Sequence, residues 1–275
     1  MDILQQIIEA KLMRLKAAKA MVSEAGLRER AIAKRAEAKP HALREALDSK
    51  GINVIAEFKR RSPSKGTIRE NADAAAIARS YQSGGAAAIS VLTEENFFDG
   101  SLDDLRDVRH AVTIPILRKD FIFDEYQIFE TAAAGADALL LIVAALDDEK
   151  LARLLGLTED ELGMDALVEV HTKEEMQRAV ALGVKLIGVN NRDLRTFVVS
   201  TETSLSLAPL APAEASLVSE SGLDPDTVRR LQAVGYKGFL VGEALMRAED
   251  PERELRVFNG NLSEPGAVAT GPKLD

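Results

Sequence analysis

The sequence predicts an α/β protein, a (β/α)8 barrel with an N-terminal helical extension, and one recurring pattern carries that prediction. A helix-like stretch ends at glycine, and a short β-rich run follows within a few residues. Glycine suits such helix ends because it adopts a positive φ at almost no cost. The β-rich runs are continuously apolar, which is typical of parallel strands covered by helices on both faces. The glycines that mark the repeat are Gly84, Gly85, Gly135, Gly163, Gly183 and Gly235.

Eight such strands are expected in all. Eight alternating units favour the closed TIM barrel. A doubly wound open sheet is the alternative, but its usual fingerprint, G-x-G-x-x-G after the first strand, is missing. Helix starts are expected at Thr172, with Glu175 completing a capping box, and at Asp224 before Pro225. The strands are expected at residues 53–57, 87–91, 115–119, 139–142, 166–169, 186–189, 215–219 and 238–241.

Both ends of the chain lie outside this repeat. A second leader helix is expected from Pro40 to Gly51. The leader, residues 1–50, should pack on the barrel, so that residues 1–258 form a single domain. Residues 259–275 have little apolar content and no period, which predicts a disordered C-terminal tail. The apolar residues that share one face of the first leader helix are Leu4, Ile8, Leu12 and Leu15.

The composition excludes several classes of protein. With 46% hydrophobic and 29% charged residues, the chain resembles ordinary soluble domains. Its net charge of −9 argues against nucleic acid or an anionic membrane as partner. The chain has no cysteine, and its three histidines are not paired at ligand spacing, so no metal site is expected. The longest apolar run, Ala138 to Leu146, is too short to cross a membrane. With no signal-peptide pattern at the start, we expect a cytoplasmic protein.

Polar side chains gather at the predicted strand ends. In a barrel of this kind, active sites lie at the carboxyl ends of the strands. One charged residue after a strand is often only a solvated loop start, whereas several that converge are hard to explain in that way. The candidates are Glu57, Lys59, Lys119, Asp120, Glu169, His171, Asn190, Arg192, Glu220, Ser221 and Glu243. Among these, we interpret His171 as a residue next to a helix cap rather than a catalyst.

Two loops are typical of a phosphate cradle. Ser221 and Gly222 follow the seventh strand, and Gly242 and Glu243 follow the eighth, where exposed backbone N–H groups can bind an anion. The loop from Lys59 to Gly66 is strongly basic and favours anion capture, although it is not a Walker A loop. Four aromatic residues beyond strand ends could line a slot for a flat ring: Phe58, Phe97, Phe98 and Phe121. At least one of Phe97 and Phe98 is expected to pack in the core or in a loop instead.

Five segments, taken together, resemble the indole-3-glycerol phosphate synthase family. The likeness extends from the N-terminal helices to about Arg247. Ala244 departs from the pattern, because many members have serine there, which removes a hydroxyl but keeps the backbone donors. The five segments are AEFKRRSPS at 56–64, RKDF at 118–121, LVEVH at 167–171, GVNNRDL at 188–194 and VSESG at 218–222.

The resemblance implies a lyase of tryptophan biosynthesis that works without cofactor or metal. It would close the ring of a small phosphorylated substrate, carboxyphenylamino-deoxyribulose phosphate, and release carbon dioxide and water. Lys119 would protonate the ketone oxygen, and Lys59 would hold the substrate carboxylate as a candidate second acid. Two ammonium groups in one site should lower the pKa of Lys119. Glu169 would be the acid or base of the dehydration.

The resemblance also implies supporting roles. Glu57 would orient the lysines, and Asn190 and Glu220 would bind sugar hydroxyls or position Lys119. Arg192 is a further candidate for anion contact. The phosphate would be bound by Ser62, Ser221, Gly222, Gly242 and Glu243.

Two other functions remain open from the sequence. A lysine at a strand end could form a Schiff base, as in an aldolase, which borohydride trapping would reveal. A non-catalytic protein that binds phosphometabolites could use the same fold. Phosphoribosylanthranilate isomerase, a neighbour in the pathway, is disfavoured because its family uses a cysteine base and this chain has no cysteine.

Overall fold

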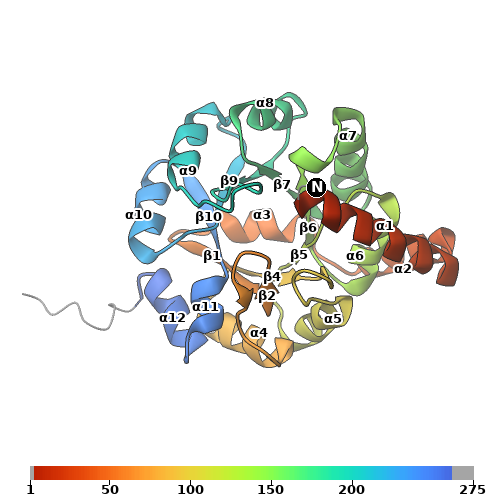
Figure 1. The fold of residues 1–275 in the computed structure, drawn as a ribbon, viewed down its shortest axis with the longest axis horizontal. Coiled ribbons are helices and arrows are strands. Elements are labelled where there is room, and N and C mark those ends of the chain that lie inside the picture. Colours follow the sequence, from red (N-terminus) through yellow and green to blue (C-terminus); the bar gives the residue numbers. More distant parts are fainter. Residues whose placement is uncertain (1–2, 262–275) are drawn as a thin grey trace, which may run out of the picture.

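Eight parallel strands close into a barrel in the computed structural model, which describes residues 3–261 (Figure 1). The strand order is β1-β10-β9-β8-β7-β6-β5-β4, and β1 pairs with both β4 and β10. This closure confirms the predicted barrel and excludes the open sheet. The strands are β1 (Asn53–Phe58), β4 (Ala88–Leu92), β5 (Ile116–Lys119), β6 (Ala138–Ile142), β7 (Asp165–Val170), β8 (Leu186–Asn190), β9 (Ser216–Glu220) and β10 (Tyr236–Val241).

Helices surround the barrel, and side chains cap several of them. Asp224 accepts the Thr227 N–H at 2.7 Å, with Pro225 in the first turn, as predicted. Thr172 accepts the Glu175 N–H, but the Glu175 carboxylate binds the N–H of His171, so the predicted box is shifted by one residue.

The described residues form twelve α-helices. They are α1 (Ile3–Met21), α2 (Glu24–Ala36), α3 (Ala42–Leu47), α4 (Ala74–Ser83), α5 (Leu102–Ala111), α6 (Glu125–Ala134), α7 (Asp148–Gly156), α8 (Lys173–Ala181), α9 (Glu202–Leu207), α10 (Pro225–Ala233), α11 (Glu243–Arg247) and α12 (Pro251–Phe258). Three short turns, η1 (Val143–Ala145), η2 (Leu157–Glu161) and η3 (Ala208–Leu210), complete the connections.

One small element was not predicted. The basic loop after β1 folds into an antiparallel hairpin of β2 (Arg61–Ser62) and β3 (Gly66–Thr67). Two-residue strands leave no periodic pattern in a sequence, so only the charge of this loop was informative.

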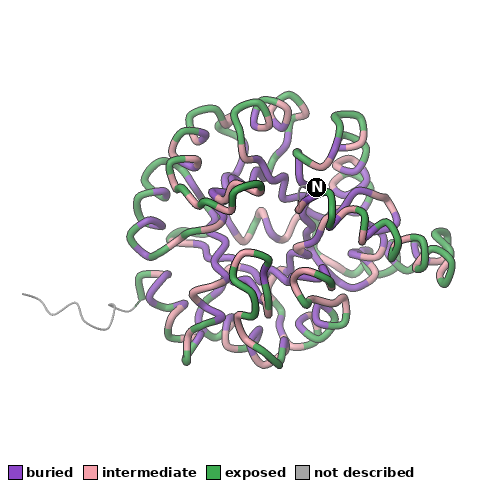
Figure 2. The backbone as a smooth tube through the Cα atoms, viewed as in Figure 1, coloured by how far each residue is buried: buried purple, intermediate pink, exposed green. Residues whose placement is uncertain are grey.

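Side-chain alternation divides the core into two layers. Along each strand, every second residue points into the barrel and the others pack against the helices. The strands are buried on both faces and the helices expose their outer sides (Figure 2). Inside the barrel lies an apolar cluster that includes Ile55, Leu117, Leu140, Leu167, Val218 and Leu240. Toward the carboxyl ends of most strands the inward-facing residues are polar, as at Glu57, Lys119, Glu169, Asn190 and Glu220.

The N-terminal extension covers the barrel at two places. Leu43 and Leu47 of α3 join the inner cluster and close the end of the barrel opposite the carboxyl ends of the strands. α3 is shorter than the helix predicted from Pro40 to Gly51, because His41 has a left-handed backbone (φ 50°) just before it. α1 lies across the rim near β5 and β6 (Figure 1).

The buried face of α1 differs from the predicted one. Leu4 and Ile7 are buried, whereas Leu12 is 50% exposed. The residue that continues the buried face is Lys11, which is only 5% exposed. A pattern of apolar residues counts lysine as polar, so the predicted buried face of the helix included Leu12 instead of Lys11.

At the other end, the described chain is tied to the barrel beyond α12. The Asn259 amide donates to the carbonyl oxygens of Gly84 and Gly85, at 3.3 and 3.0 Å. The predicted tail, residues 259–275, therefore begins with a residue that contacts the fold. From residue 262 onward, that prediction lies outside the described residues.

Lys11 forms a buried ion pair next to the end of β5. Its Nζ lies 2.7 Å from Asp120 Oδ1, and Arg118 and Thr93 bind the other oxygen at 2.9 and 2.6 Å. Burial alone would raise the pKa of Asp120, but Lys11 and Arg118 lower it to about 2. This pair joins α1 to the strand that carries Lys119.

We expect Lys11→Met to destabilise the protein by about 3 kcal/mol, because it leaves a buried carboxylate without one of its two cations. Urea unfolding at pH 7 measures the change. Lys16→Met, the same substitution on the exposed side of α1, is the control and should cost less than about 0.5 kcal/mol. Equal effects of the two substitutions would contradict the role given to the ion pair.

Candidate active site

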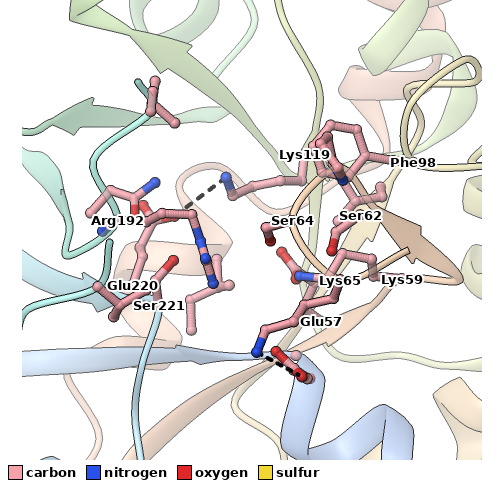
Figure 3. Close-up of a pocket in the computed structure, with 18 of the residues that line it drawn as sticks. Glu57, Lys59, Ser62, Ser64, Lys65, Phe98, Lys119, Arg192, Glu220 and Ser221 are labelled. Carbon is pink, nitrogen blue, oxygen red and sulfur yellow. Dashed lines mark hydrogen bonds and ion pairs between the residues drawn. The ribbon is translucent and has the colours of Figure 1, made fainter. Parts of the chain in front are cut away.

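A cavity of about 790 Å³ opens at the carboxyl ends of the strands. It brings together all the residues predicted to act in catalysis or to bind the substrate except Phe58, and the candidates His171 and Phe97 also lie outside it. From one side come Arg192, Glu220 and Ser221, from the other Lys59, Ser62 and Ser64, and Lys119 reaches between them (Figure 3). The predicted residues that line the cavity are Glu57, Lys59, Ser62, Phe98, Lys119, Asp120, Phe121, Glu169, Asn190, Arg192, Glu220, Ser221, Gly222, Gly242 and Glu243.

Phe58 was wrongly assigned to the cavity. It is the last residue of β1 and follows the inward-facing Glu57, so alternation turns its ring toward the helices. There it is 1% exposed, and the Arg60 guanidinium lies 4.8 Å from its ring centroid. Phe58 therefore packs in the outer core layer.

Lys119 is held between two buried carboxylates. Its Nζ lies 3.1 Å from Glu169 Oε2 and 3.4 Å from Glu220 Oε2. Burial alone would lower the pKa of Lys119, but Glu169, Glu220 and Glu57 outweigh burial and raise it. The expected lowering by the second lysine is therefore wrong, because carboxylates dominate the surroundings of Lys119. The ammonium keeps its proton at neutral pH.

The two carboxylates differ in charge. Burial would raise the pKa of Glu169, but the cations of Lys119 and His171 lower it, so this carboxyl is ionised. Burial and the like charges of Glu169 and Glu57 raise the pKa of Glu220 despite the nearby Lys119. Like-charged carboxyl groups in one site titrate apart for this reason. Glu169 is therefore the carboxyl that stays ionised beside the lysine, and Glu220 is the carboxyl that more readily holds a proton.

A second pair lies beside the first. Lys59 and Glu57 form an ion pair and a hydrogen bond, with side chains 18% and 5% exposed. Glu57 also contributes to the raised pKa of Lys119, so the two pairs share one electrostatic field. The site thus contains two ammonium groups, each next to a carboxylate.

Inward-facing glycines make room for these carboxylates. A Cβ at Gly188 would overlap Glu220 Oε1, and a Cβ at Gly242 would overlap Glu57 Oε1. Both φ angles lie outside the left-handed region, so the requirement for glycine comes from space rather than from backbone conformation. Gly242 was predicted as a phosphate-binding residue, and the role of Gly188 was not predicted.

Aromatic and apolar groups form one wall of the cavity. The rings of Phe98 and Phe121 lie 6.1 Å apart at 38°. Phe98 is held because the buried carboxylate of Glu94 accepts the N–H groups of Asn96, Phe97 and Phe98. Of the two neighbouring phenylalanines, Phe98 therefore lines the cavity, and Phe97 does not.

Helix α1 adds apolar residues to the cavity that the sequence did not indicate. Ile3, Leu4 and Ile7 line it, although they precede β1 by about fifty residues. Their helical spacing predicted a packed face but not what it packs on. Arg247 is a charged lining residue that was also missed, whereas Ser64 and Lys65 belong to the predicted basic loop and Asp120 to the predicted strand ends.

The opposite end of the cavity is suited to an anion. Ser221 and Gly222 have consecutive left-handed backbones (φ 68° and 70°), which makes a concave stretch of peptide. The carboxylate of Glu243 is bound by Arg247 at 3.1 Å and faces Lys65 at 3.8 Å. Arg192, Lys65 and Arg247 therefore offset the acidic net charge at this end.

Neither a metal-binding cluster nor a membrane-spanning helix is found in the described part of the chain. Within residues 3–261, no group of three or more His, Asp or Glu side chains is arranged to hold a metal ion. In the same range, no helix combines the length and apolar character needed to cross a membrane.

Comparison with known proteins gives a consistent match. The family model described as indole-3-glycerol phosphate synthase matches residues 4–258. The protein of that name from Nocardioides sp. is 56% identical over 211 residues, covering 76% of this chain and 81% of its own. The one from Carboxydothermus hydrogenoformans is 46% identical over 261 residues, with 93% and 98% covered. The one from Bordetella pertussis is 48% identical over 256 residues, with 92% and 97% covered.

Solved structures with much lower identity share the fold. KGPDC from Streptococcus mutans superposes with a TM-score of 0.59 at 16% identity and covers 77% of this chain and 97% of its own. A 3-hexulose-6-phosphate synthase gives a TM-score of 0.60 at 16% identity, with 77% and 100% covered. At this identity the likeness supports the barrel architecture alone.

We expect Gly188→Ala to destabilise the protein by about 1–3 kcal/mol, because the added methyl displaces the Glu220 carboxylate. Removing that carboxylate should relieve the overlap. Gly188→Ala and Glu220→Ala should therefore be coupled by more than about 1 kcal/mol in a double-mutant cycle of unfolding free energies. In the matched control cycle with Glu57→Ala, the two effects should add within about 0.5 kcal/mol. Equal coupling in both cycles would show that the methyl meets something other than Glu220.

Proposed function

The chain belongs to the indole-3-glycerol phosphate synthase family, and from that premise we propose how its residues divide the reaction. The enzyme is a carboxy-lyase of tryptophan biosynthesis. It converts 1-(2-carboxyphenylamino)-1-deoxyribulose 5-phosphate to indole-3-glycerol phosphate by ring closure, decarboxylation and dehydration. The observation that carries the proposal is the Lys119 ammonium, which is held between Glu169 and Glu220 at the centre of the cavity.

The shape of the cavity suggests how the substrate lies. Its phosphate would bind at the Ser221–Gly222 and Gly242–Glu243 ends of β9 and β10, with Ser62 and Arg192 nearby. Its aromatic ring would lie on the wall formed by Phe98 and Phe121. The ketone carbon, which lies between these two ends of the substrate, would then be within reach of Lys119.

Lys119 acts as the general acid of ring closure in this proposal. The ring carbon that bears the carboxylate attacks the ketone carbon, and the electron pair of the carbonyl moves onto oxygen. The Lys119 ammonium donates a proton to that oxygen and gives an alcohol. An alkoxide is more basic than an amine, so a lysine with a raised pKa can still donate. Lys59 would hold the substrate carboxylate during this step.

Decarboxylation and dehydration complete the reaction. The carboxylate leaves as carbon dioxide, and its electron pair restores the aromatic ring. The new hydroxyl then leaves as water after taking a proton from an acid, for which Lys59 is the candidate. The ring nitrogen loses its proton to a base. Glu169 is our candidate for this base, because its lowered pKa keeps it ionised beside Lys119. A proton then leaves the adjacent ring CH2 and the nitrogen is protonated again, which gives the aromatic indole.

Three residues would act by position. Glu57 binds Lys59 and Glu220 binds Lys119, so each carboxylate directs an ammonium into the cavity. Asn190 is 8% exposed at the end of β8 and would contact the sugar hydroxyls. Its Oδ1 also accepts the N–H of Arg192, which ties the loop after β8 to the strand.

A Schiff-base reaction fits the site less well. Such chemistry needs a neutral amine as nucleophile. Glu169, Glu220 and Glu57 raise the pKa of Lys119 and so keep it protonated. Borohydride with substrate should therefore leave no adduct on Lys119.

We also propose that the enzyme works in the cytoplasm and binds no nucleic acid. The net charge of −9 and the absence of cysteine from the chain support this assignment.

We expect Lys119→Ala and Glu169→Gln each to lower kcat by about 10²–10⁴-fold with little change in KM, because proton transfer acts on the transition state. Lys119→Arg should not restore turnover, since a guanidinium gives up a proton poorly. The chain has no tryptophan, so indole fluorescence from the product reports turnover directly.

Lys65→Ala serves as the control, because Lys65 lines the cavity at 49% side-chain exposure and takes no part in the proposed proton transfers. Any effect of this substitution should fall on KM. Near-normal turnover of Lys119→Arg, or a rise in KM with kcat spared in Lys119→Ala, would make Lys119 a binding residue and move the acid to Lys59.

Inorganic phosphate should compete with the substrate, because the loops after β9 and β10 are proposed to bind an anion. It should raise the apparent KM and leave kcat unchanged. Chloride at the same ionic strength is the control for screening. If phosphate inhibits no more than chloride does, the anion site has been misplaced.

A further inference from the structure

We propose that His171 is a positioning residue that, as an imidazolium, holds the carboxylate of Glu169 from behind and keeps it ionised. This inference rests on the role proposed above for Glu169. His171 does not line the cavity, so it would act through Glu169 and not on the substrate.

The two oxygens of Glu169 face different cations. Oε2 lies 3.1 Å from Lys119 Nζ, and Oε1 lies 3.3 Å from His171 Nε2. The side chains of Glu169 and His171 are 2% and 11% exposed. One oxygen therefore points to the reacting centre, and the other is held by an aromatic ring that water scarcely reaches.

His171 is itself fixed by the start of α8. Its Nδ1 lies 3.3 Å from Glu175 Oε2, and the same oxygen accepts the His171 backbone N–H at 2.6 Å. Thr172 caps the helix one residue later. The shifted capping box thus fixes both the backbone and the ring of His171, and this determines which ring nitrogen faces Glu169.

The groups around the ring favour its charged form. β7 contributes Glu169, and α8 contributes Glu175. η1, which packs on both elements, contributes only apolar side chains, and the nearby Arg178 is bound to Asp148 and to the carbonyl oxygens of Val143 and Leu146. The neighbouring strands place Ile142 and Gly188 beside Glu169. Two carboxylates therefore face the His171 ring, one from each of the elements next to it.

The charge of the ring determines what Glu169 can do. A neutral His171 with its proton on Nδ1 would turn a lone pair toward Glu169 Oε1, and the two acceptors would repel each other. An imidazolium instead turns Nδ1–H toward Glu175 Oε2, at hydrogen-bond distance, and places its positive charge at Nε2 3.3 Å from Glu169 Oε1 as an ion pair. Burial would lower the pKa of His171, but Glu169 and Glu175 raise it to about 10. The pair is therefore intact through neutral pH and is lost as the pH rises through about 10.

Two titrations test the proposal without activity. The chain has three histidines, His41, His110 and His171, so ¹⁵N-labelled imidazoles can be followed individually and assigned with His171→Gln. In the wild type, His171 should titrate near pH 10. In Glu169→Gln, its pKa should fall by about one unit or more, because the negative charge on the cavity side of the ring is lost. An unchanged titration of His171 in Glu169→Gln would overturn the proposal.

Kinetics supply a second readout. His171→Asn removes the group that reaches Glu169, and His171→Gln keeps a donor of similar reach without the charge. Both should lower kcat by about tenfold or more with little change in KM. The wild type should show a fall in kcat near pH 10, and both variants should lose it. Full activity of His171→Gln with an unchanged alkaline limb would overturn the proposal.

The outcome can be separated from that of the proposed function. If Glu169→Gln retains turnover, the role of Glu169 in the dehydration is wrong, while the histidine titration still decides whether the pair exists. If Glu169→Gln is inactive and His171→Gln behaves as wild type, the positioning role alone is wrong.

Discussion

The buried ammonium of Lys119 is the constraint on which the rest of the site depends. A charge taken out of water is stable only with close partners of opposite sign. Lys119 is 15% exposed and has Glu169 and Glu220 within 3.4 Å. Those carboxyl groups are more buried than the lysine, at 2% exposure, so the ionised Glu169 in turn needs its charge. The barrel can hold this cluster because parallel strands bring residues far apart in the chain to one end of the fold.

Alternation along the strands decides which residues join the cluster. Glu57 and Phe58 follow each other in β1, so Glu57 points into the barrel and Phe58 points outward, toward the helices. The cluster also needs space inside a barrel that side chains otherwise fill. Gly188 and Gly242 leave that space beneath Glu220 and Glu57. Small residues on the inner face of the strands are therefore as much a part of the site as the charged ones.

Local patterns in the sequence predicted the barrel and most of the cavity. Strand ends, apolar runs and glycine-terminated helices are short-range signals, and Lys119, Glu169 and Glu220 follow from them by topology alone. The missed features depend on contacts between distant segments. Lys11 is buried because Asp120 meets it, and α1 closes the cavity because of that contact. No spacing in the sequence carries that information.

The errors have the same origin. Phe58 was assigned by its position after a strand, without regard to the face on which it lies. A second lysine in the same site predicts a lowered pKa of Lys119, because two positive charges repel each other. In the structure, carboxylates surround Lys119 and raise its pKa. His171 was interpreted as a residue next to a helix cap. It has that position, and the same geometry also places its ring against Glu169.

The central claim is that Lys119, and not Lys59, faces the ketone oxygen of the substrate. A crystal structure of Glu169→Gln with bound substrate tests it most directly, because this variant should bind the substrate and turn it over slowly. The account predicts Lys119 Nζ within hydrogen-bond distance of the ketone oxygen and Lys59 next to the substrate carboxylate. A ketone oxygen bound by Lys59, with Lys119 remaining on Glu220 alone, would contradict it.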